Sequence, residues 1–210
     1  AIENSLKMLG VDYIDLYQIH GWNSEYPIEE SMETMRLLQK QGKTRFIGVS
    51  NFNADQISQA LQTAHFTSSQ PRYNMFDREI EREDIDFCQQ FGIGILAHSP
   101  LAKGLLTGKY SSDFQFPSDD ERSNYHRFQG KLFSRYLAAA DKLKKIAHQK
   151  GVTLVQLSIA WALRLPAISC VLVGAKTADQ VREQAVAATI TLSDDELKMI
   201  SQILATAPES

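Results

Sequence analysis

The stretch that decides the fold is Gly92-Ile93-Gly94-Ile95-Leu96-Ala97-His98. It is almost entirely apolar until its last residue, which is typical of a strand buried on both faces of a parallel sheet. Helical patterns flank this strand, over residues 83–91 before it and over residues 131–149 after a long loop. Strands of this kind are connected by helices that cover the sheet, so the sequence predicts repeated βα units.

The same alternation runs along the whole chain. It predicts strands over residues 11–20, 45–51, a short run ending at Tyr73-Asn74, 92–98 and 168–174, and helices over residues 28–41, 54–64, 83–91, 131–149, 153–165, 178–187 and 193–204. Asn53 is a suitable N-cap and Gly42 a suitable C-cap. The run Ser193-Asp194-Asp195-Glu196 has the spacing of a capping box. We therefore predict about five βα units.

Two architectures contain such repeats, the closed eight-stranded barrel and the open doubly wound sheet. Neither a G-x-G-x-x-G nor a G-x-x-x-x-G-K-[ST] phosphate loop occurs in the chain. The strands end instead in His20, Ser50-Asn51, Tyr73-Asn74, His98-Ser99 and Gly174-Ala175-Lys176. Polar residues at strand ends are what the active face of a barrel requires. The predicted class is α/β, a (β/α)8 TIM barrel of which this chain is an incomplete portion.

Composition excludes several classes of function. The 210 residues are 43% apolar and carry a net charge of −3, with no run of lysine or arginine that would bind nucleic acid or a membrane surface. No apolar stretch approaches the length of a membrane span, and no signal peptide opens the chain. Two cysteines, Cys88 and Cys170, are expected to be buried and inert in a reducing compartment. The histidines form no close-spaced pair that would predict a metal site, and we expect a cytoplasmic protein.

The beginning of the chain looks like the middle of a helix. It starts at Ala1, and Ile2, Leu6 and Leu9 follow at helical spacing. We therefore expect residues 1–210 to be one barrel domain truncated at its N-terminus, with an incompletely closed sheet and exposed strand edges.

Five segments together resemble one known family, in the same order and at strand ends. They are Leu9-Gly10-Val11-Asp12-Tyr13-Ile14-Asp15-Leu16-Tyr17-Gln18-Ile19-His20, Gly48-Val49-Ser50-Asn51-Phe52, Gln70-Pro71-Arg72-Tyr73-Asn74, Ser99-Pro100-Leu101-Ala102-Lys103-Gly104-Leu105-Leu106-Thr107-Gly108-Lys109 and Val173-Gly174-Ala175-Lys176-Thr177. The chain resembles the aldo-keto reductases. The resemblance implies a barrel, a nicotinamide cofactor and the reduction of carbonyl compounds.

The resemblance implies that His20 is the active-site histidine, which donates a hydrogen bond to the substrate carbonyl. A lone histidine is more often a surface or core residue, and only its position at a strand end within a matching motif favours the catalytic role. Trp22 would form a wall of the substrate pocket, although an aromatic residue in a loop is as often simple packing. Tyr26 and the loop over residues 111–124 are further candidates for the pocket, because so long a loop is usually functional or mobile.

The cofactor residues follow from the same resemblance. Ser50, Asn51 and Gln70 match residues that bind the nicotinamide carboxamide, and Ser50-Asn51 is also compatible with a simple helix cap. His98 stands where the family usually has a tyrosine or tryptophan that stacks on the nicotinamide ring. Ser99, Leu101, Lys103, Gly104 and Leu105 match the loop over the pyrophosphate. Gly174, Ala175, Lys176, Thr177, Gln180 and Gln184 match an adenosine phosphate site at a helix N-terminus, where Lys176 favours NADPH over NADH.

One departure limits the functional prediction. The family's proton donor is a tyrosine supported by a lysine and an aspartate, and none of the tyrosines here lies in that motif; the three residues would precede Ala1. The leading hypothesis is an NADPH-dependent reductase of aldehydes or ketones, of which this chain supplies His20 and the cofactor contacts. Alternatives are a non-catalytic NADPH-binding subunit like the potassium-channel β subunits, or an unrelated phosphate-binding barrel whose motifs only mimic the family.

Overall fold

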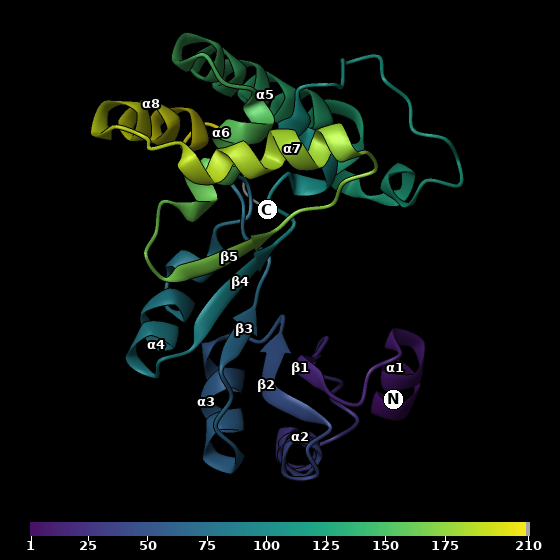
Figure 1. Cartoon of the computed structure of the whole chain (residues 1–210). Helices are drawn as coiled ribbons and strands as arrows, with labels where there is room; N and C mark the ends of the chain where they lie inside the picture. The colour runs from purple at the N-terminus through teal and green to yellow at the C-terminus, as the bar shows by residue number, and fades with distance from the viewer. Residues whose placement is uncertain (209–210) are drawn as a thin grey trace. The chain divides into compact units, whose positions relative to one another are not determined.

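The computed structural model describes residues 1–208 of the chain (Figure 1). These residues form two compact units. Unit 1 contains residues 1–71 and 80–96, and unit 2 contains residues 72–79 and everything from residue 97 onward.

Unit 1 consists of short parallel strands, each followed by a helix. Its elements are α1 (Ile2–Leu9), β1 (Ile14–Ile19), α2 (Ile28–Lys40), β2 (Thr44–Ser50), α3 (Ala54–Thr63), β3 (Ser68–Gln70) and α4 (Asp84–Gln90). β4 (Gly94–His98) and the 3-10 helix η1 (Glu79–Glu81) are each divided between the two units. β1 pairs with β2, β2 with β3 and β3 with β4, in parallel throughout.

The core of unit 1 lies between β2 and the helices that cover it. Met32 and Met35 of α2 and Ile57 of α3 are buried, and so is Val49 of β2. α3 begins where the sequence predicted, because the Asn53 side chain accepts a hydrogen bond from the Gln56 amide at 2.9 Å. The Gln56 side chain returns a bond to the Asn53 amide, which completes a capping box.

Unit 2 is mainly helical. It contains η2 (Ala102–Thr107), η3 (Glu121–Asn124), η4 (His126–Phe128), α5 (Gly130–Lys150), α6 (Leu154–Leu163), β5 (Ile168–Leu172), α7 (Ala178–Val186), η5 (Ala187–Thr189) and α8 (Asp194–Leu204). α6 is the central helix, packed against α5, α7, β5 and η2. Because it is surrounded, it is apolar on all faces instead of along one stripe.

An aromatic cluster fixes α6 in unit 2. The rings of Trp161 and Tyr73 stack with centroids 5.2 Å apart, and both residues are buried. The Arg164 guanidinium lies 3.7 Å from the centroid of the Trp161 ring and donates a hydrogen bond of 2.7 Å to the Tyr73 hydroxyl. A cation over a tryptophan face is favourable, so the charge at the end of α6 is stabilised where it lies.

The strands follow one another in the order β1-β2-β3-β4-β5. A doubly wound sheet reverses its strand order near the middle, so this simple succession agrees with the predicted barrel and excludes the alternative. β1 is an edge strand of the described sheet, and none of its residues is fully buried.

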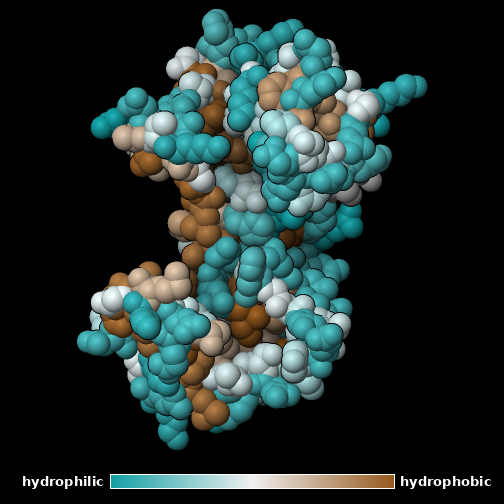
Figure 2. All heavy atoms as spheres, turned by 90° about the vertical axis from the view of Figure 1, so that its right-hand side faces the viewer, coloured by the Kyte–Doolittle hydropathy of each residue, from teal (hydrophilic) through white to brown (hydrophobic). Residues whose placement is uncertain are grey.

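An apolar groove of about 440 Å³ lies beside β1 in unit 1. Tyr17 and Ile19 of β1 and Met35 and Leu38 of α2 are among its lining residues. Figure 2 views the side of unit 1 that carries α1 and β1, where hydrophobic atoms gather in the middle and hydrophilic atoms surround them.

The structure corrects four details of the sequence prediction. The third strand ends at Gln70 and not at Tyr73-Asn74, because Asn74 enters a tight turn with Asp77. Gly42 is the residue after the C-cap Gln41, where its φ of 73° closes the helix end. The first strand begins at Ile14. Cys88 is buried as expected, but Cys170 is exposed because β5 turns only Ile168 fully into the core.

No helix among residues 1–208 has both the length and the apolar character needed to cross a membrane.

Candidate functional site

Hydrogen bonds bring four predicted site residues together at the carboxyl ends of β1, β2 and β3 in unit 1. The Asn51 side-chain amide donates to the backbone carbonyl of His20 at 2.9 Å and lies 3.1 Å from the Ser50 hydroxyl. Ser50 donates its hydroxyl to the backbone carbonyl of Gln70 at 2.8 Å. Asn51 adopts a left-handed φ of 57°, which a non-glycine residue rarely does. His20, Ser50, Asn51 and Gln70 are therefore held in one constellation.

The surroundings of these residues differ. Ser50 is buried, whereas His20 and Asn51 are exposed and Gln70 is half-buried. An exposed imidazole beside neighbours held by hydrogen bonds can offer its ring to a ligand. The Trp22 indole, two residues later, donates to the backbone carbonyl of Tyr26 at 2.9 Å, and both rings are exposed. Both aromatic residues lie in the loop that follows His20 in the sequence.

Sequence reasoning missed Gln18 as a site residue. Its Oε1 accepts a hydrogen bond of 2.6 Å from Gln70 Nε2, and its own Nε2 donates to the Ser68 hydroxyl at 3.1 Å. The signal that could have revealed it is alternation, because residues two apart in a strand point to the same face and Gln18 lies two before His20.

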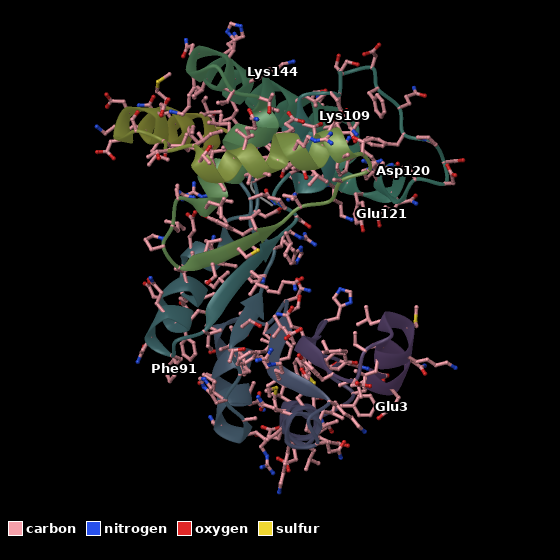
Figure 3. The ribbon with its side chains drawn as sticks, in the orientation of Figure 1. Glu3, Phe91, Lys109, Asp120, Glu121 and Lys144 are labelled. Atoms are coloured by element: carbon pink, nitrogen blue, oxygen red, sulfur yellow. The ribbon has the colours of Figure 1, made fainter. Side chains whose placement is uncertain are left out.

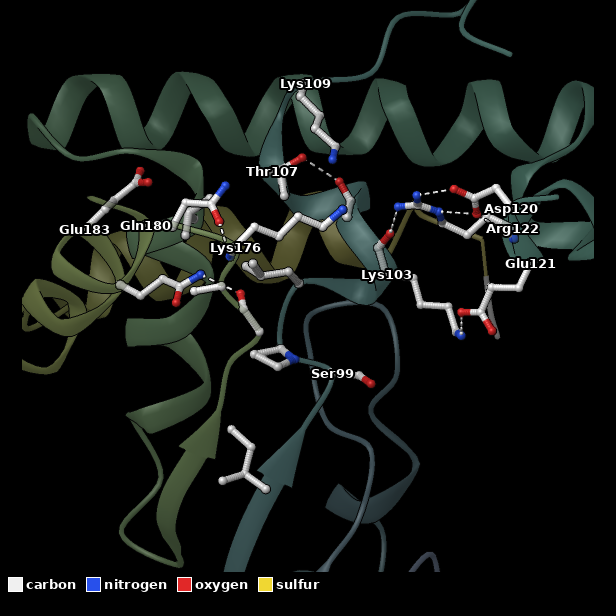
Figure 4. A pocket seen from close by; sticks show the side chains of 18 residues that line it. Ser99, Lys103, Thr107, Lys109, Asp120, Glu121, Arg122, Lys176, Gln180 and Glu183 are labelled. Carbon is white, nitrogen blue, oxygen red and sulfur yellow. Dashed lines mark hydrogen bonds and ion pairs between the residues drawn. The ribbon is translucent and has the colours of Figure 1, made fainter. Parts of the chain in front are cut away.

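Unit 2 contains a pocket of about 1040 Å³, shown in Figure 4. Its lining comes from the segment after β4, the loop before α5, the start of α6, and the segment from the end of β5 into α7. The lining residues are Ser99, Pro100, Leu101, Lys103, Gly104, Thr107, Lys109, Asp120, Glu121, Arg122, Val155, Leu172, Gly174, Ala175, Lys176, Gln180, Glu183 and Gln184. Most of the residues predicted to contact the cofactor's phosphates and adenosine therefore line one cavity.

The segment after β4 has an unusual backbone. Ser99, Ala102 and Lys103 have positive φ angles of 58°, 47° and 54°, and Gly104 has a φ of 103°. A Cβ on Gly104 would lie 2.8 Å from the Tyr110 hydroxyl, so glycine is required there by the packing of Tyr110. Non-glycine residues keep such backbone angles only where the surrounding structure enforces them. Residues of this kind cluster at binding sites.

The cations of the pocket are partly paired with carboxylates of the loop over residues 111–124. Lys103 Nζ donates to Glu121 at 2.6 Å and lies 4.5 Å from the centroid of the Tyr125 ring. Although burial opposes the charged form of Lys103, the contacts with Glu121 and Tyr125 raise the pKa of its ammonium group. The pocket thus holds a lysine that stays charged.

Arg122 and Asp120 were not predicted individually, although the loop that carries them was. The Arg122 guanidinium forms two hydrogen bonds with the Asp120 carboxylate and one of 2.7 Å with the Tyr110 hydroxyl. The bond from Arg122 lowers the pKa of the Asp120 carboxyl to about 2. Figure 3 labels Lys109, Asp120 and Glu121 in unit 2, and all three line the pocket. Nothing in a single sequence indicates which residues of a long loop turn inward.

The segment after β5 forms the opposite wall. Thr177 caps α7 by accepting from the Gln180 amide at 3.3 Å. The Gln180 side chain accepts from the Lys176 amide at 2.7 Å, and the Gln184 side chain donates to the Gly174 carbonyl at 3.0 Å. These bonds occupy the backbone N–H groups of Lys176 and Gln180 at the predicted phosphate site. The Lys176 side chain points into the cavity on the side of Thr107 (Figure 4).

Six predicted cofactor residues do not line this pocket, and three of them, Ser50, Asn51 and Gln70, belong to the constellation in unit 1. Leu105 is buried in the core of unit 2, and Thr177 serves as the helix cap. His98 is half-buried, and its Nδ1 lies 2.9 Å from the Ser99 hydroxyl. Ser99 lines the pocket, so the His98 imidazole contacts the pocket lining although His98 is not part of it.

The residues present fit a nucleotide with several phosphates. Lysine, arginine and exposed backbone from glycine offer donors and positive charge to phosphate oxygens, and Gln180 and Gln184 offer amides. The open space around Gly174, where a Cβ would meet no atom within 4 Å, leaves that side of the cavity accessible. Among residues 1–208 there is no group of three or more histidine, cysteine or acidic side chains placed to hold a metal ion.

Comparison with known proteins identifies relatives of this chain. The chain is 38% identical over 204 residues to the aldo-keto reductase YhdN of Bacillus subtilis, covering 97% of this chain and 62% of the relative. It is 36% identical to the NADP(+) aldo-keto reductase yakc of Schizosaccharomyces pombe, covering 96% and 60%. A probable voltage-gated potassium channel subunit beta of Arabidopsis thaliana is 35% identical, with coverage of 98% and 66%.

A solved structure has a similar fold. The glycerol dehydrogenase AKR11B4 of Gluconobacter oxydans superposes with a TM-score of 0.91 at 36% identity, covering 100% of this chain and 64% of the other. The fold is thus that of a parallel-stranded TIM barrel, of which these residues provide five strands.

The model of the aldo/keto reductase family matches residues 1–205. The chain belongs to the aldo-keto reductase family, and it spans about 60% of the length of the curated relatives named above. This match removes the alternative of an unrelated barrel whose motifs only imitate the family.

Proposed function

We propose that the protein carrying this chain is an NADPH-dependent oxidoreductase that reduces aldehydes or ketones to alcohols. The observation that carries the proposal is the unit 2 pocket, where Lys103, Lys109, Arg122 and Lys176 surround a cavity large enough for the phosphates and adenosine of a dinucleotide. Membership of the family supports the same activity. The bound nicotinamide dinucleotide would supply the hydride for the carbonyl carbon.

A separate set of residues, in unit 1, would contact the nicotinamide and the substrate. We propose that Ser50, Asn51 and Gln70 contact the nicotinamide carboxamide, which needs both donors and acceptors. His20 would donate a hydrogen bond to the carbonyl oxygen of a small substrate, and Trp22 would line its pocket. The tyrosine that protonates this oxygen, with its lysine and aspartate, would lie outside the 210 residues.

The preference for NADPH over NADH rests on positive charge. A 2′-phosphate adds an anion that Lys176 and Arg122 can both approach, since they line the same cavity. Asp120 and Glu121 lie in the same lining and oppose an anion there. The conformation of the loop over residues 111–124 therefore decides how strongly the pocket prefers NADPH over NADH. For this reason both cofactors are included in the test.

A second candidate is a non-catalytic, NADPH-binding regulatory subunit. The similarity to a probable potassium channel subunit beta favours it, because that relative shares 35% of its residues with this chain. The cofactor site would be the same for both candidates. They differ in turnover alone.

The test is fluorescence titration with NADPH and NADH, followed by aldehyde-dependent oxidation of the bound cofactor. Both are measured on this chain and on a version extended upstream, with His20→Ala as the variant. A reductase predicts NADPH binding, with turnover in the extended protein that His20→Ala reduces by roughly 100-fold or more. Binding without turnover in the extended protein would support the regulatory subunit, and no binding of either cofactor to either version would refute both.

We also propose a cytoplasmic location and no nucleic-acid or membrane partner. The pI near 6.0 and the mixed surface charge support this proposal.

A further inference from the structure

Gln18 forms the centre of a hydrogen-bonded chain across three strands of unit 1. Its Nε2 lies 3.1 Å from the Ser68 hydroxyl of β3 and 3.4 Å from the Val49 backbone carbonyl of β2. Its Oε1 accepts the bond of 2.6 Å from Gln70 Nε2. Two amide side chains are thus joined head to tail.

The orientation of both amides follows from the backbone. A carbonyl oxygen can only accept, so the end of the Gln18 amide that faces the Val49 carbonyl must be its NH2 group. The oxygen of Gln18 then faces Gln70, which must present its own NH2 group in return. Gln70 is left with Oε1 as its available acceptor, and no hydrogen bond to that oxygen occurs within residues 1–208.

Gly48 makes this chain possible. It lies in β2 directly between Gln18 of β1 and Ser68 of β3 in the strand register. A Cβ at residue 48 would lie 2.2 Å from the Ser68 hydroxyl oxygen and 3.1 Å from Cγ of Gln18. A side chain there would block the path, so glycine is needed for packing and not for a special backbone angle.

We propose that Gln18 is a positioning residue that fixes the polarity of Gln70, so that Gln70 Oε1 accepts from the NH2 group of the nicotinamide carboxamide. The inference rests on the proposed cofactor site and adds the residue that orients it. Because the carboxamide sets the rotation of the nicotinamide ring, Gln18 would influence which face of the ring meets the substrate.

The test compares Gln18→Glu and Gln18→Leu with the unmodified chain, using two probes. NADPH contains the nicotinamide, whereas 2′,5′-ADP contains only phosphates and adenosine, the groups proposed to bind in the unit 2 pocket. At pH 8 both variants should bind NADPH about tenfold more weakly, because leucine cannot accept from Gln70 and the carboxylate of Gln18→Glu is repelled by the Val49 carbonyl that holds the Gln18 amide in place. Both should bind 2′,5′-ADP as the unmodified chain does. Gln59→Leu, at an exposed glutamine on α3 bonded to Glu29, is the matched control and should change neither affinity.

A pH series distinguishes positioning from loss of packing. The carboxylate introduced by Gln18→Glu accepts but cannot donate to the Val49 carbonyl, whereas its protonated form can. NADPH affinity of this variant should therefore recover as the pH falls from 8 toward 5, while that of Gln18→Leu should not. The same pH series on the unmodified chain is the reference for both variants.

Unchanged NADPH affinity in both variants would overturn the inference, and so would an equal loss of NADPH and 2′,5′-ADP or a Gln18→Glu variant without recovery at low pH. Failure of both the unmodified chain and its upstream-extended version to bind either probe would instead refute the proposed function.

Discussion

Asp77 is a buried carboxylate on which several residues of unit 2 converge. Arg127 donates to both of its oxygens, at 2.8 Å and 2.5 Å, and Asn74 donates to one at 2.8 Å. The Asn74 amide also donates to the backbone carbonyl of Ser99, which lines the pocket. The pair therefore links the end of the long loop to the strained segment after β4.

Replacing Asp77 by Asn should destabilise the protein by about 3 kcal/mol at pH 7, because Arg127 is left without its partner. Burial alone would raise the pKa of the Asp77 carboxyl, but the bonds from Arg127 and Asn74 outweigh it and hold the pKa below its usual value. The stabilisation by the carboxylate is thus complete above the unfolded-state pKa of about 4 and is lost as the pH falls through the folded-state pKa. Urea unfolding of both proteins at pH 7 and at pH 3.5 should show a smaller difference at the lower pH.

Asp179→Asn is the control for this measurement. Its ion pair with Arg182 is largely exposed, so the change should cost less than about 0.5 kcal/mol at either pH. An equal effect of Asp77→Asn at both pH values would contradict the role given to the ionised carboxylate.

The two cysteines should react very differently with a thiol reagent. Cys88 is buried, and burial, with a smaller contribution from the charge of Asp84, raises its pKa to about 11. At pH 8 only about one Cys88 thiol in a thousand is ionised. Cys170 is exposed. Ellman's reagent should modify one thiol per folded chain and two in guanidinium, and Cys170→Ser should abolish the fast reaction. Fast reaction of both thiols in the folded protein would contradict the burial of Cys88.

Among the elements, the loop over residues 111–124 carries carboxylates that compete with a phosphate ligand. The Glu121 carboxylate lies 2.6 Å from Lys103 Nζ and forms an ion pair with it, although the Glu121 side chain is 67% exposed. Glu121→Gln removes that competing charge and should strengthen 2′,5′-ADP binding about two- to fivefold, within the range of an exposed ion pair.

Isothermal titration at low and moderate salt measures this gain, which should shrink as salt screens the charges. Glu33→Gln removes an equivalent exposed pair with Arg36 on α2 and serves as the control. Weaker binding by Glu121→Gln would mean that the Lys103 contact holds the loop in its binding conformation.

The elements themselves could largely be predicted from sequence. Asn53, Thr153 and Ser193 each cap a helix, and their capping signals are local, so the helices begin within a residue or two of the expected positions. The third strand was misjudged because Tyr73 has strand character, yet its ring packs on Trp161 of α6, far away in sequence. Burial of Tyr73 reflects tertiary packing and not strand pairing.

At the scale of the whole molecule, the family and the fold were readable because motifs recur at strand ends in a fixed order. The residues that sequence reasoning missed have a different origin. Gln18 acts through a neighbour on another strand, and Arg122 turns inward from a loop with no periodicity. Both depend on contacts through space that no local pattern records.

The pocket lies wholly in unit 2, so a ligand without nicotinamide should stabilise that unit alone. Hydrogen exchange with saturating 2′,5′-ADP should slow in residues 99–108, 118–124 and 172–184, where backbone lines the cavity. The amides of α3 in unit 1 should exchange at the same rate with and without ligand. Protection of residues 1–71 would contradict a site confined to unit 2.

The uneven exposure of the two thiols also makes the chain a ready scaffold for an optical reporter. Cys170 and the pocket residue Leu172 are two positions apart on β5 and so project from the same face of the strand. An environment-sensitive dye coupled to Cys170 would sit on the strand that leads into the cavity, while Cys88 stays unlabelled. A single coupling step, without mutagenesis, would then convert nucleotide occupancy into a change of emission.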